Sequence, residues 1–370
     1  MALDHVRDLL HTQSAIESPT DLSTTTPVLF FTRWITYLCA PTFVFLAGTS
    51  AFLSLNAHTD FSKQRKWLLK RGLWLVIAEF TLVNFGMFFD LGMHTLIFEV
   101  IATIGFGFII LALLLGRSVK FILIIGVVIF LFHDLSAFIP AEKVSGPISV
   151  VLPFFNLQVF PFLNNHVFVM AYPPIPWLGI MLLGFSAGPL FKVSESKRKI
   201  LFRNIGIGAV LTFVIIRFIN IYGDPSPWAS QKYNLVSFLS FMNVSKYPPS
   251  LQFCLITLGI MFLMLSFSEG RVNAPGNIAQ TYGKVPLFYF VVHFYLIHCL
   301  LILILFIQGF HWNDMNFANG GFGRPKDKIS GLSLGGVYIV WIAVVCSLYL
   351  PCKWFGRYKK GNQAWWLKYI

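Results

Sequence analysis

Apolar residues recur along this chain in long runs that polar or turn-forming positions separate. Clear examples are 74–89, 119–132 and 285–306. About 20 such residues in a helix are enough to cross the hydrocarbon of a bilayer. The pattern predicts membrane-spanning helices at 30–54, 68–89, 93–115, 119–138, 170–190, 200–221, 249–268, 285–308 and 333–352. A short opening helix at 1–11 brings the expected total to about ten, with the first one truncated.

The opening segment has a polar helical pattern and almost no apolar residues before it. We expect the first helix of the complete bundle to begin upstream, with Met1 as an internal methionine of a longer product. The alternative is a short amphipathic helix that lies on the membrane surface.

The composition supports the membrane interpretation. Hydrophobic residues make up 56% of the 370 residues and charged residues only 12%, about half the charged fraction of an ordinary soluble domain. The expected fold is therefore all-α, a polytopic integral membrane helical bundle. One transmembrane acyltransferase-like domain is expected at 1–352, followed by a cytoplasmic basic tail at 353–370.

Basic residues gather in alternate loops. The clusters lie at 63–71, 117–120, 192–203, 271–284 and 353–368, and together they hold 19 of the 28 Lys and Arg residues. Basic loops face the cytoplasm, so the termini of the complete bundle are expected there, in the inner (plasma) membrane if the source is a bacterium. Topology accounts for the net charge of +13, and no nucleic-acid partner is expected.

The five cysteines show no paired or metal-ligand spacing. We interpret them as small buried hydrophobic residues, and no metal is expected. The lipid bilayer is the expected environment of the apolar exterior, which also permits a homodimer.

Ionisable side chains within the predicted helices concentrate in their outer halves, and Glu79 is the main exception. Because such groups are costly in a membrane, their clustering marks a functional region. The distribution predicts a polar cavity that opens outward.

The opening helix offers a candidate general base. Asp4, Asp8 and His11 fall within a sector of roughly 60° on a helix, and His5 lies about 60° beyond Asp8. A carboxylate that orients a histidine raises its basicity, and N-acetyl transfer needs a base to take a proton from the attacking amine. The alternative is a solvated helix end with paired charges.

Further candidates lie elsewhere in the chain. His293 falls within a predicted span, Lys246 and Ser250 precede another, and Ser250 could instead cap the following helix. Arg33 stands where a helix enters the bundle, and Arg71 belongs to the basic inner rim, which a phosphate-bearing cofactor would favour. His298 is spaced five residues from His293, so their side chains point about 140° apart.

Several segments taken together resemble the bacterial relatives of heparan-alpha-glucosaminide N-acetyltransferase, within the transmembrane acyltransferase superfamily. They are 3–8, 31–50, 172–179, 222–225, 243–250 and 285–298. The resemblance extends from residue 1 to about residue 300.

The resemblance implies a helical bundle that binds acetyl-CoA from the cytosolic face and passes the acetyl group to a glucosamine-type amino sugar of a glycan on the other side. It also implies a histidine after the first helix as base or acetyl carrier, preceded by an asparagine. Asp4 stands in the place of that asparagine, and the histidine corresponds to His5 or His11. It implies that acetyl-CoA docks at the basic inner rim and extends its pantetheine arm toward the outer polar cavity. The candidate contacts are Arg33, Arg71, Lys246, His293 and Ser250.

Two other functions remain open from the sequence. A membrane O-acyltransferase of surface polysaccharides would share the histidine at the end of the first helix. A small-molecule transporter or permease would also line its path with polar residues. Dependence on acetyl-CoA separates either enzyme from a transporter.

Overall fold

The computed structural model describes residues 1–12, 18–55, 60–139, 146–271, 273–318, 320–326 and 328–368, with only the backbone of Trp365 and Lys368. Within these residues, eight helical segments are long and apolar enough to cross a membrane, and α6 (Val100–Leu114) is a shorter apolar helix. The eight are Pro27–Leu55, Phe61–Phe88, Val119–Phe138, Pro174–Lys192, Glu195–Ile219, Leu251–Ser268, Pro286–Ile307 and Leu334–Gly361. The predicted all-α, multi-pass membrane bundle is confirmed.

The helix expected at 30–54 is broken in two. α2 (Pro27–Thr36) and α3 (Cys39–Leu55) are separated by a turn at residues 37–38. Pro41 lies in the first turn of α3, where its missing N–H has no helical partner to lose. The chain can therefore change direction just before this proline.

The helix expected at 68–89 begins earlier and changes its winding. α4 (Phe61–Ala78) starts at Phe61 because the Asp60 carboxylate accepts hydrogen bonds from two amide N–H groups of its first turn. A π-helical turn, Glu79–Val83, then joins α4 to α5 (Asn84–Phe88). Single π turns widen a helix locally and are frequent at functional sites.

The helix expected at 93–115 begins instead with a strand. β1 (Thr95–Phe98) runs parallel to β3 (His166–Met170), which pairs antiparallel with β2 (Gln158–Phe162). The Asn84 side chain covers the other edge of β1, since it donates to the carbonyl of Thr95 and accepts from the N–H of Ile97.

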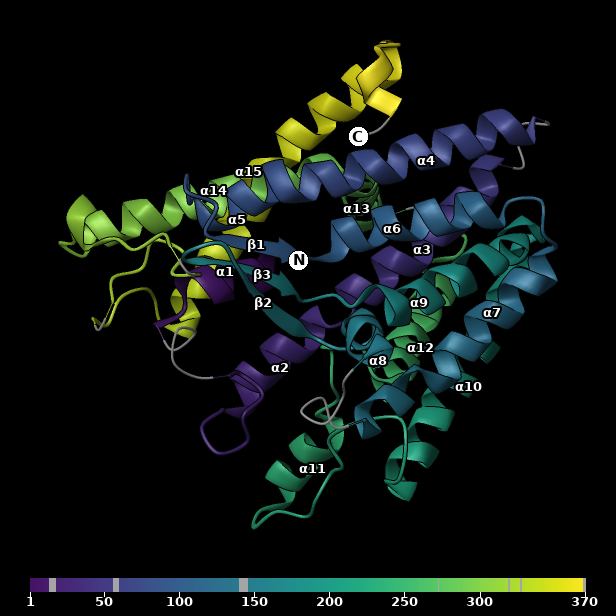
Figure 1. Cartoon of the computed structure of the whole chain (residues 1–370), viewed down its shortest axis with the longest axis horizontal. Coiled ribbons are helices and arrows are strands. Elements are labelled where there is room, and N and C mark those ends of the chain that lie inside the picture. The colour runs from purple at the N-terminus through teal and green to yellow at the C-terminus, as the bar shows by residue number, and fades with distance from the viewer. Residues whose placement is uncertain are drawn as a thin grey trace.

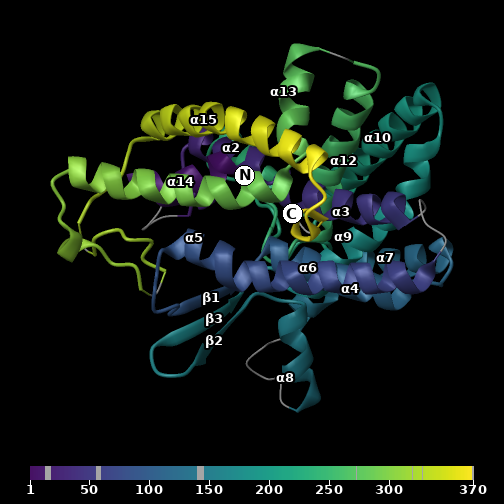
Figure 2. The same ribbon diagram turned by 90° about the horizontal axis from the view of Figure 1, so that it is seen from above.

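This sheet lies at the edge of the bundle, near α5 and the protruding α8 (Pro147–Val151), as Figure 2 shows. It fixes the point at which the chain enters α6. Glu99, the single residue between β1 and α6, is thereby held at the edge of the helical core.

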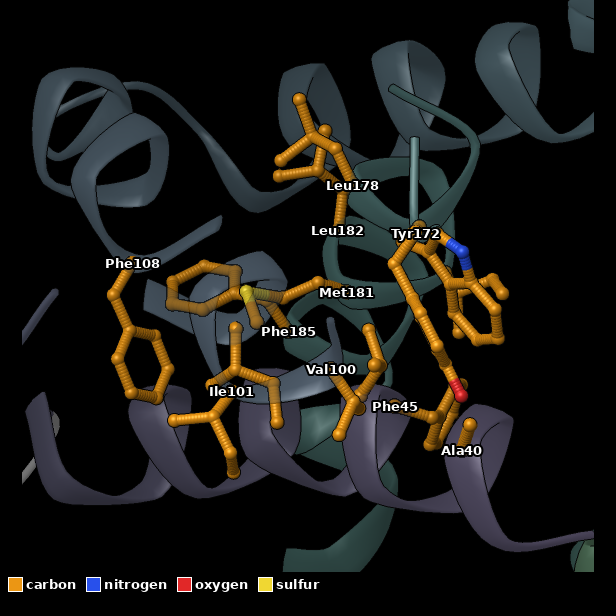
Figure 3. Packing of buried hydrophobic residues seen from close by; sticks show 14 of the residues in the cluster. Ala40, Phe45, Val100, Ile101, Phe108, Tyr172, Leu178, Met181, Leu182 and Phe185 are labelled. Atoms are coloured by element: carbon orange, nitrogen blue, oxygen red, sulfur yellow. The ribbon is translucent and has the colours of Figure 1, made fainter. Parts of the chain in front are cut away.

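The helices pack largely in neighbouring pairs. α4 lies along α6, and α3 lies along α9 (Pro174–Ser186) (Figure 1). α9 also packs on α7 (Val119–Phe132). Figure 3 shows side chains of α6 and α9 meeting above α3, where they form the main apolar core.

The remaining helices complete the bundle around this core. They are α10 (Glu195–Ile219), α11 (Asn234–Met242), α12 (Leu251–Ser268), α13 (Ala274–Gly283), α14 (Pro286–Ile307) and α15 (Leu334–Gly361). α10 packs closely on α12. α15 continues past its expected end at 352, so residues 353–361 of the predicted tail are helical, while residues 369–370 lie outside the described residues.

α1 (Ala2–Leu10) is neither a surface helix nor a solvated end. It packs against α14 and α15 with most of its apolar side chains buried. The charged side chains of Asp4 and Arg7 are buried as well.

The prediction that all five cysteines are buried is wrong for two of them. Cys254 and Cys352 are buried and Cys39 is half-buried, but Cys299 and Cys346 are exposed on the outer surfaces of α14 and α15. A periphery that faces lipid accepts a small apolar side chain as readily as the core does.

Candidate functional site

A cavity of about 150 Å³ lies beside α1. We call it the polar cavity, because α1, the start of α6 and the loop before α12 contribute ionisable side chains to it. These are Asp4, His5, Asp8, Glu99 and Lys246. Aromatic side chains complete much of the wall: Phe88, Tyr172, Tyr247, Phe290, Phe294 and Phe322. Five ionisable side chains from three separate segments of the chain thus line one cavity.

Asp4 is the centre of a buried ionic network. One carboxylate oxygen lies 2.5 Å from Nη1 of Arg33 and 2.7 Å from Nη2 of Arg7, and it accepts a hydrogen bond of 2.8 Å from the Thr36 hydroxyl. The other oxygen lies 3.7 Å from Nζ of Lys246. Burial alone would raise the pKa of Asp4, but Arg33, Lys246 and Arg7 hold that pKa well below its usual range.

Asp8 lies one turn further along α1 and is half-exposed. Its carboxylate contacts Arg7 at 2.5 Å and Arg33 at 3.9 Å. The two arginines therefore neutralise Asp4 and Asp8 together, and Arg33 acts here as a partner of carboxylates.

His5 faces the cavity from the neighbouring side of α1. Its ring centroid lies 4.1 Å from that of Phe294 and 5.2 Å from that of His293. Burial lowers the pKa of His5 to about 3, although Asp4 acts in the opposite direction. The imidazole is therefore neutral at physiological pH, with a nitrogen lone pair available.

His293 stands behind His5 and is fully buried. Its Nδ1 lies 3.0 Å from the carbonyl oxygen of Tyr289, and its Nε2 has no hydrogen-bond partner among the described residues. His298 faces Phe89 instead, with 4.0 Å between ring centroids. The prediction that the two histidines of α14 point to different places is confirmed.

Lys246 enters the cavity from the loop before α12. Its Nζ lies over the rings of Tyr247, at 4.9 Å from the centroid, and Tyr172, at 5.8 Å. Although burial acts to lower it, the pKa of Lys246 is raised by Tyr247 and Asp4. The cation is thus kept in a mostly aromatic setting.

Ser250 does not reach this cavity. Its hydroxyl accepts a hydrogen bond from the N–H of Phe253, at 3.0 Å, and donates one of 2.7 Å to Asp224. The alternative reading of Ser250 as the cap of the following helix is confirmed.

His11 is also absent from the cavity wall. Its backbone pairs with Leu332, and its carbonyl accepts a hydrogen bond of 2.9 Å from Arg324. Burial, with Arg7 and Arg324, lowers the pKa of His11. The helical spacing of His11 and Asp8 did not bring both to one site, because α1 ends at Leu10.

Glu79 and Glu99 lie close together at the start of α6, and no partner for Glu79 was predicted from the sequence. Glu79 in the π turn is fully buried, and its Oε2 accepts a hydrogen bond of 2.8 Å from the N–H of Ala102. Its Oε1 has no hydrogen-bond partner among the described residues. Glu99 precedes α6 without capping it and faces the polar cavity. In the sequence, this pair was indicated only by the presence of two acidic residues in otherwise apolar runs.

A second, larger cavity of about 650 Å³ lies next to the first. We call it the apolar cavity. It shares five wall residues with the polar cavity: Met1, Cys39, Phe43, Val100 and Phe290. Its volume falls within the usual range for small-molecule sites.

The apolar cavity is lined by two cations, Arg71 and Lys359, and by no Asp or Glu among the described residues. The Arg71 guanidinium lies over the rings of Trp67, at 5.2 Å, and Phe108, at 5.4 Å. Its Nε is buried without a hydrogen-bond partner in the described part of the chain. This cavity therefore suits a ligand that is largely apolar and carries negative charge at one end.

The described residues include no group of three His, Cys, Asp or Glu side chains arranged to hold a metal ion. The polar cavity is lined by a neutral imidazole, carboxyl groups and a lysine, and the apolar cavity by two cations.

The sequence model of the family "Heparan-alpha-glucosaminide N-acetyltransferase, catalytic" matches residues 9–220, which is more than half of the chain. The match includes Arg33, Arg71 and Glu99, whereas His5 and Lys246 lie outside it. No curated protein and no solved structure matches the chain. The extent of the family match means that this chain belongs to the heparan-alpha-glucosaminide N-acetyltransferase catalytic family.

Proposed function

We propose that this membrane protein transfers the acetyl group of acetyl-CoA to an amino sugar of the glucosamine type. Membership of the family supports acetyl transfer. We further propose that acetyl-CoA enters from the cytoplasm and that the acceptor arrives from the opposite side. The basic clusters at 63–71, 192–203 and 353–368 support this orientation.

The observation that carries the proposal is that the two cavities are adjacent and share five wall residues. CoA joins a phosphate-bearing nucleotide to a long, mostly uncharged arm that ends in the thioester. Arg71 and Lys359 are suited to the anionic end, and the apolar walls to the arm. Such an arm would bring the thioester past Cys39 and Phe43 to the polar cavity.

We propose that His5 acts on the acetyl group. Its neutral imidazole lines the polar cavity, with Asp4 next to it in sequence and His293 behind it. A neutral imidazole can attack the thioester and carry the acetyl group, or accept a proton while the acceptor attacks directly. Lys246 stands on the same wall, where a cation would stabilise the developing oxyanion.

The first test is acetyl-CoA binding and transfer by the purified protein. With radiolabelled acetyl-CoA, the native chain is expected to label glucosamine. His5→Ala should lower the rate by about 100-fold or more, the scale of a lost acid–base or nucleophilic group. His11→Ala is the matched control, because His11 lies away from the cavity, and it should keep most of the activity.

Arg71→Ala tests the binding half of the proposal. Loss of a charge-assisted contact of about 1.5 kcal/mol or more should weaken acetyl-CoA binding roughly tenfold. It should leave turnover at saturating acetyl-CoA nearly unchanged. If the native chain neither binds acetyl-CoA nor transfers its acetyl group, the acetyltransferase proposal is wrong and a transporter becomes the better explanation.

A further inference from the structure

The polar cavity contains three carboxyl groups, and only two of them have ionic partners. Asp4 contacts Arg7, Arg33 and Lys246, and Asp8 contacts the same two arginines. No ion pair within 4.0 Å involves Glu99 among the described residues. Glu99 is thus the carboxyl group whose counter-charge the protein does not supply at contact distance.

Glu99 also does not cap α6, although its position at the start of that helix would allow it to do so. It stands at the N-cap of α6, where an acidic side chain commonly accepts hydrogen bonds from the first amides. Here Glu79 accepts from Ala102 instead, and Glu99 makes no such bond. The π turn that carries Glu79 brings this substitute cap into the bundle. The Glu99 carboxyl can therefore face the cavity.

His5, on the same cavity wall, is too weak a base near pH 7 to take the proton of an ammonium ion. Desolvation by the surrounding side chains keeps the imidazole neutral and weakly basic near pH 7. An acceptor amine arrives as an ammonium ion and must lose a proton before its nitrogen can attack. A second group has to take that proton, and Glu99 lines the same small cavity as His5.

We propose that Glu99 is the group that binds the ammonium of the acceptor and takes its proton before the nitrogen attacks. The inference rests on the proposed acetyl transfer. A carboxylate matches an ammonium in charge and offsets the cost of bringing it into a buried site. A neutral hydroxyl would bring no such charge and would need a stronger base.

The proton balance is complete. The ammonium gives one proton to the Glu99 carboxylate, and the nitrogen lone pair then attacks the acetyl carbon. The new C–N bond forms as the bond to the carrier breaks, whether the carrier is the CoA sulfur or a His5 nitrogen. The departing carrier takes the second proton from the nitrogen, and the product is a neutral amide. Release of the Glu99 proton to solvent restores the site.

The charged groups around Glu99, together with its burial, set the pKa of its carboxyl group. They are Lys246, Asp4, Asp8, Arg33 and Glu79. Burial raises the pKa of Glu99 to about 7; Asp4 and Asp8 act in the same direction, and Lys246 and Arg33 oppose it. Because the carboxylate is the active form, the rate should fall as the pH decreases through about 7.

The test compares two sugars that differ only at carbon 2, glucosamine and glucose, as acceptors for the full chain in detergent. The native protein should prefer glucosamine by at least about 100-fold. Glu99→Gln should raise the KM for glucosamine, lower kcat/KM by about 100-fold and abolish the acidic limb of the pH profile. Glu99→Asp restores the charge and should recover part of the rate and the acidic limb.

Asp21→Asn, which changes an exposed carboxylate outside both cavities, is the control and should behave as the native chain. Unchanged acetyl-CoA affinity of Glu99→Gln will show that the variant is folded. Equal use of glucose and glucosamine, or a Glu99→Gln variant with native KM and pH profile, overturns the inference but leaves acetyl transfer intact. Failure of the native chain to transfer acetyl to any acceptor overturns both proposals.

Discussion

Asp4 shows how a single buried carboxylate organises the region around α1. Its two oxygens contact Arg7, Arg33, Thr36 and Lys246, which belong to α1, α2 and the loop before α12. Removing one member of a buried ionic network leaves the others without compensation, which costs more than an exposed pair contributes.

Asp4→Asn should therefore destabilise the protein by about 3–5 kcal/mol. The pKa of Asp4 is depressed in the folded state, so its stabilisation is fully present above the unfolded pKa of about 3.9 and is lost as the pH falls through the folded value. Thermal unfolding in detergent at pH 7 measures the difference. Asp8→Asn is the matched control, because Asp8 is half-exposed, and it should cost about 1 kcal/mol or less. Equal losses from both variants would contradict the central role of Asp4.

Sequence spacing predicted part of this arrangement. The periodicity of an α-helix placed Asp4 and Asp8 on one side of α1, and both line the polar cavity. It could not reveal that Arg33 and Lys246 would meet them, because those contacts join segments far apart in the chain. The same limit explains why Glu79 stood out within its predicted span but could not be assigned Glu99 as a neighbour.

At the scale of elements, long apolar runs predicted most helices, since twenty apolar residues have few alternatives in a membrane. They did not predict the turn at 37–38, the π turn or the small sheet. Each of these depends on one or two residues within or beside an apolar run, such as Pro41, Glu79 and Asn84. Hydrophobicity averaged over a window does not detect such positions.

Contact between α3 and α9 depends on a glycine. A Cβ at Gly184 would lie 2.0 Å from the carbonyl oxygen of Phe45, and the Thr49 hydroxyl donates a hydrogen bond of 2.8 Å to the carbonyl of Gly184. Small residues allow such close approach of membrane helices. Because backbone and not a flexible side chain stands in the way, the helices would have to separate to accept a methyl group.

Gly184→Ala should therefore lower the stability by about 1–3 kcal/mol, in spite of the better helix propensity of alanine. Gly208→Ala on α10 is the matched control, since a Cβ there meets nothing within 4 Å. That change should be neutral or stabilising by up to about 1 kcal/mol. Thermal unfolding of both variants in one detergent compares them, and a stabilised Gly184→Ala would mean that the helices are not so closely packed.

For the whole molecule, the basic clusters and the positions of the two cavities are consistent with the same proposed orientation of the bundle in the membrane. The amino-terminal end of α4 and the carboxy-terminal end of α15 contain basic clusters, and Arg71 and Lys359 of the apolar cavity belong to the same two helices. The polar cavity is formed by α1, the start of α6 and the loop before α12. A donor from the cytoplasm and an acceptor from the other side would thus approach the shared wall from opposite directions.

Cysteine labelling in intact cells tests this orientation. Lys63 is exposed at the start of α4, and Lys232 is exposed in the loop before α11. Lys63→Cys should react with a membrane-impermeant maleimide only after the cells are permeabilised, because the positive-inside rule predicts a cytoplasmic position for this residue. Lys232→Cys should react in intact cells, and the native chain, with its five cysteines, gives the background. The reverse pattern would turn Arg71 and Lys359 away from cytosolic acetyl-CoA, and the proposed path of the donor through the apolar cavity would then be untenable.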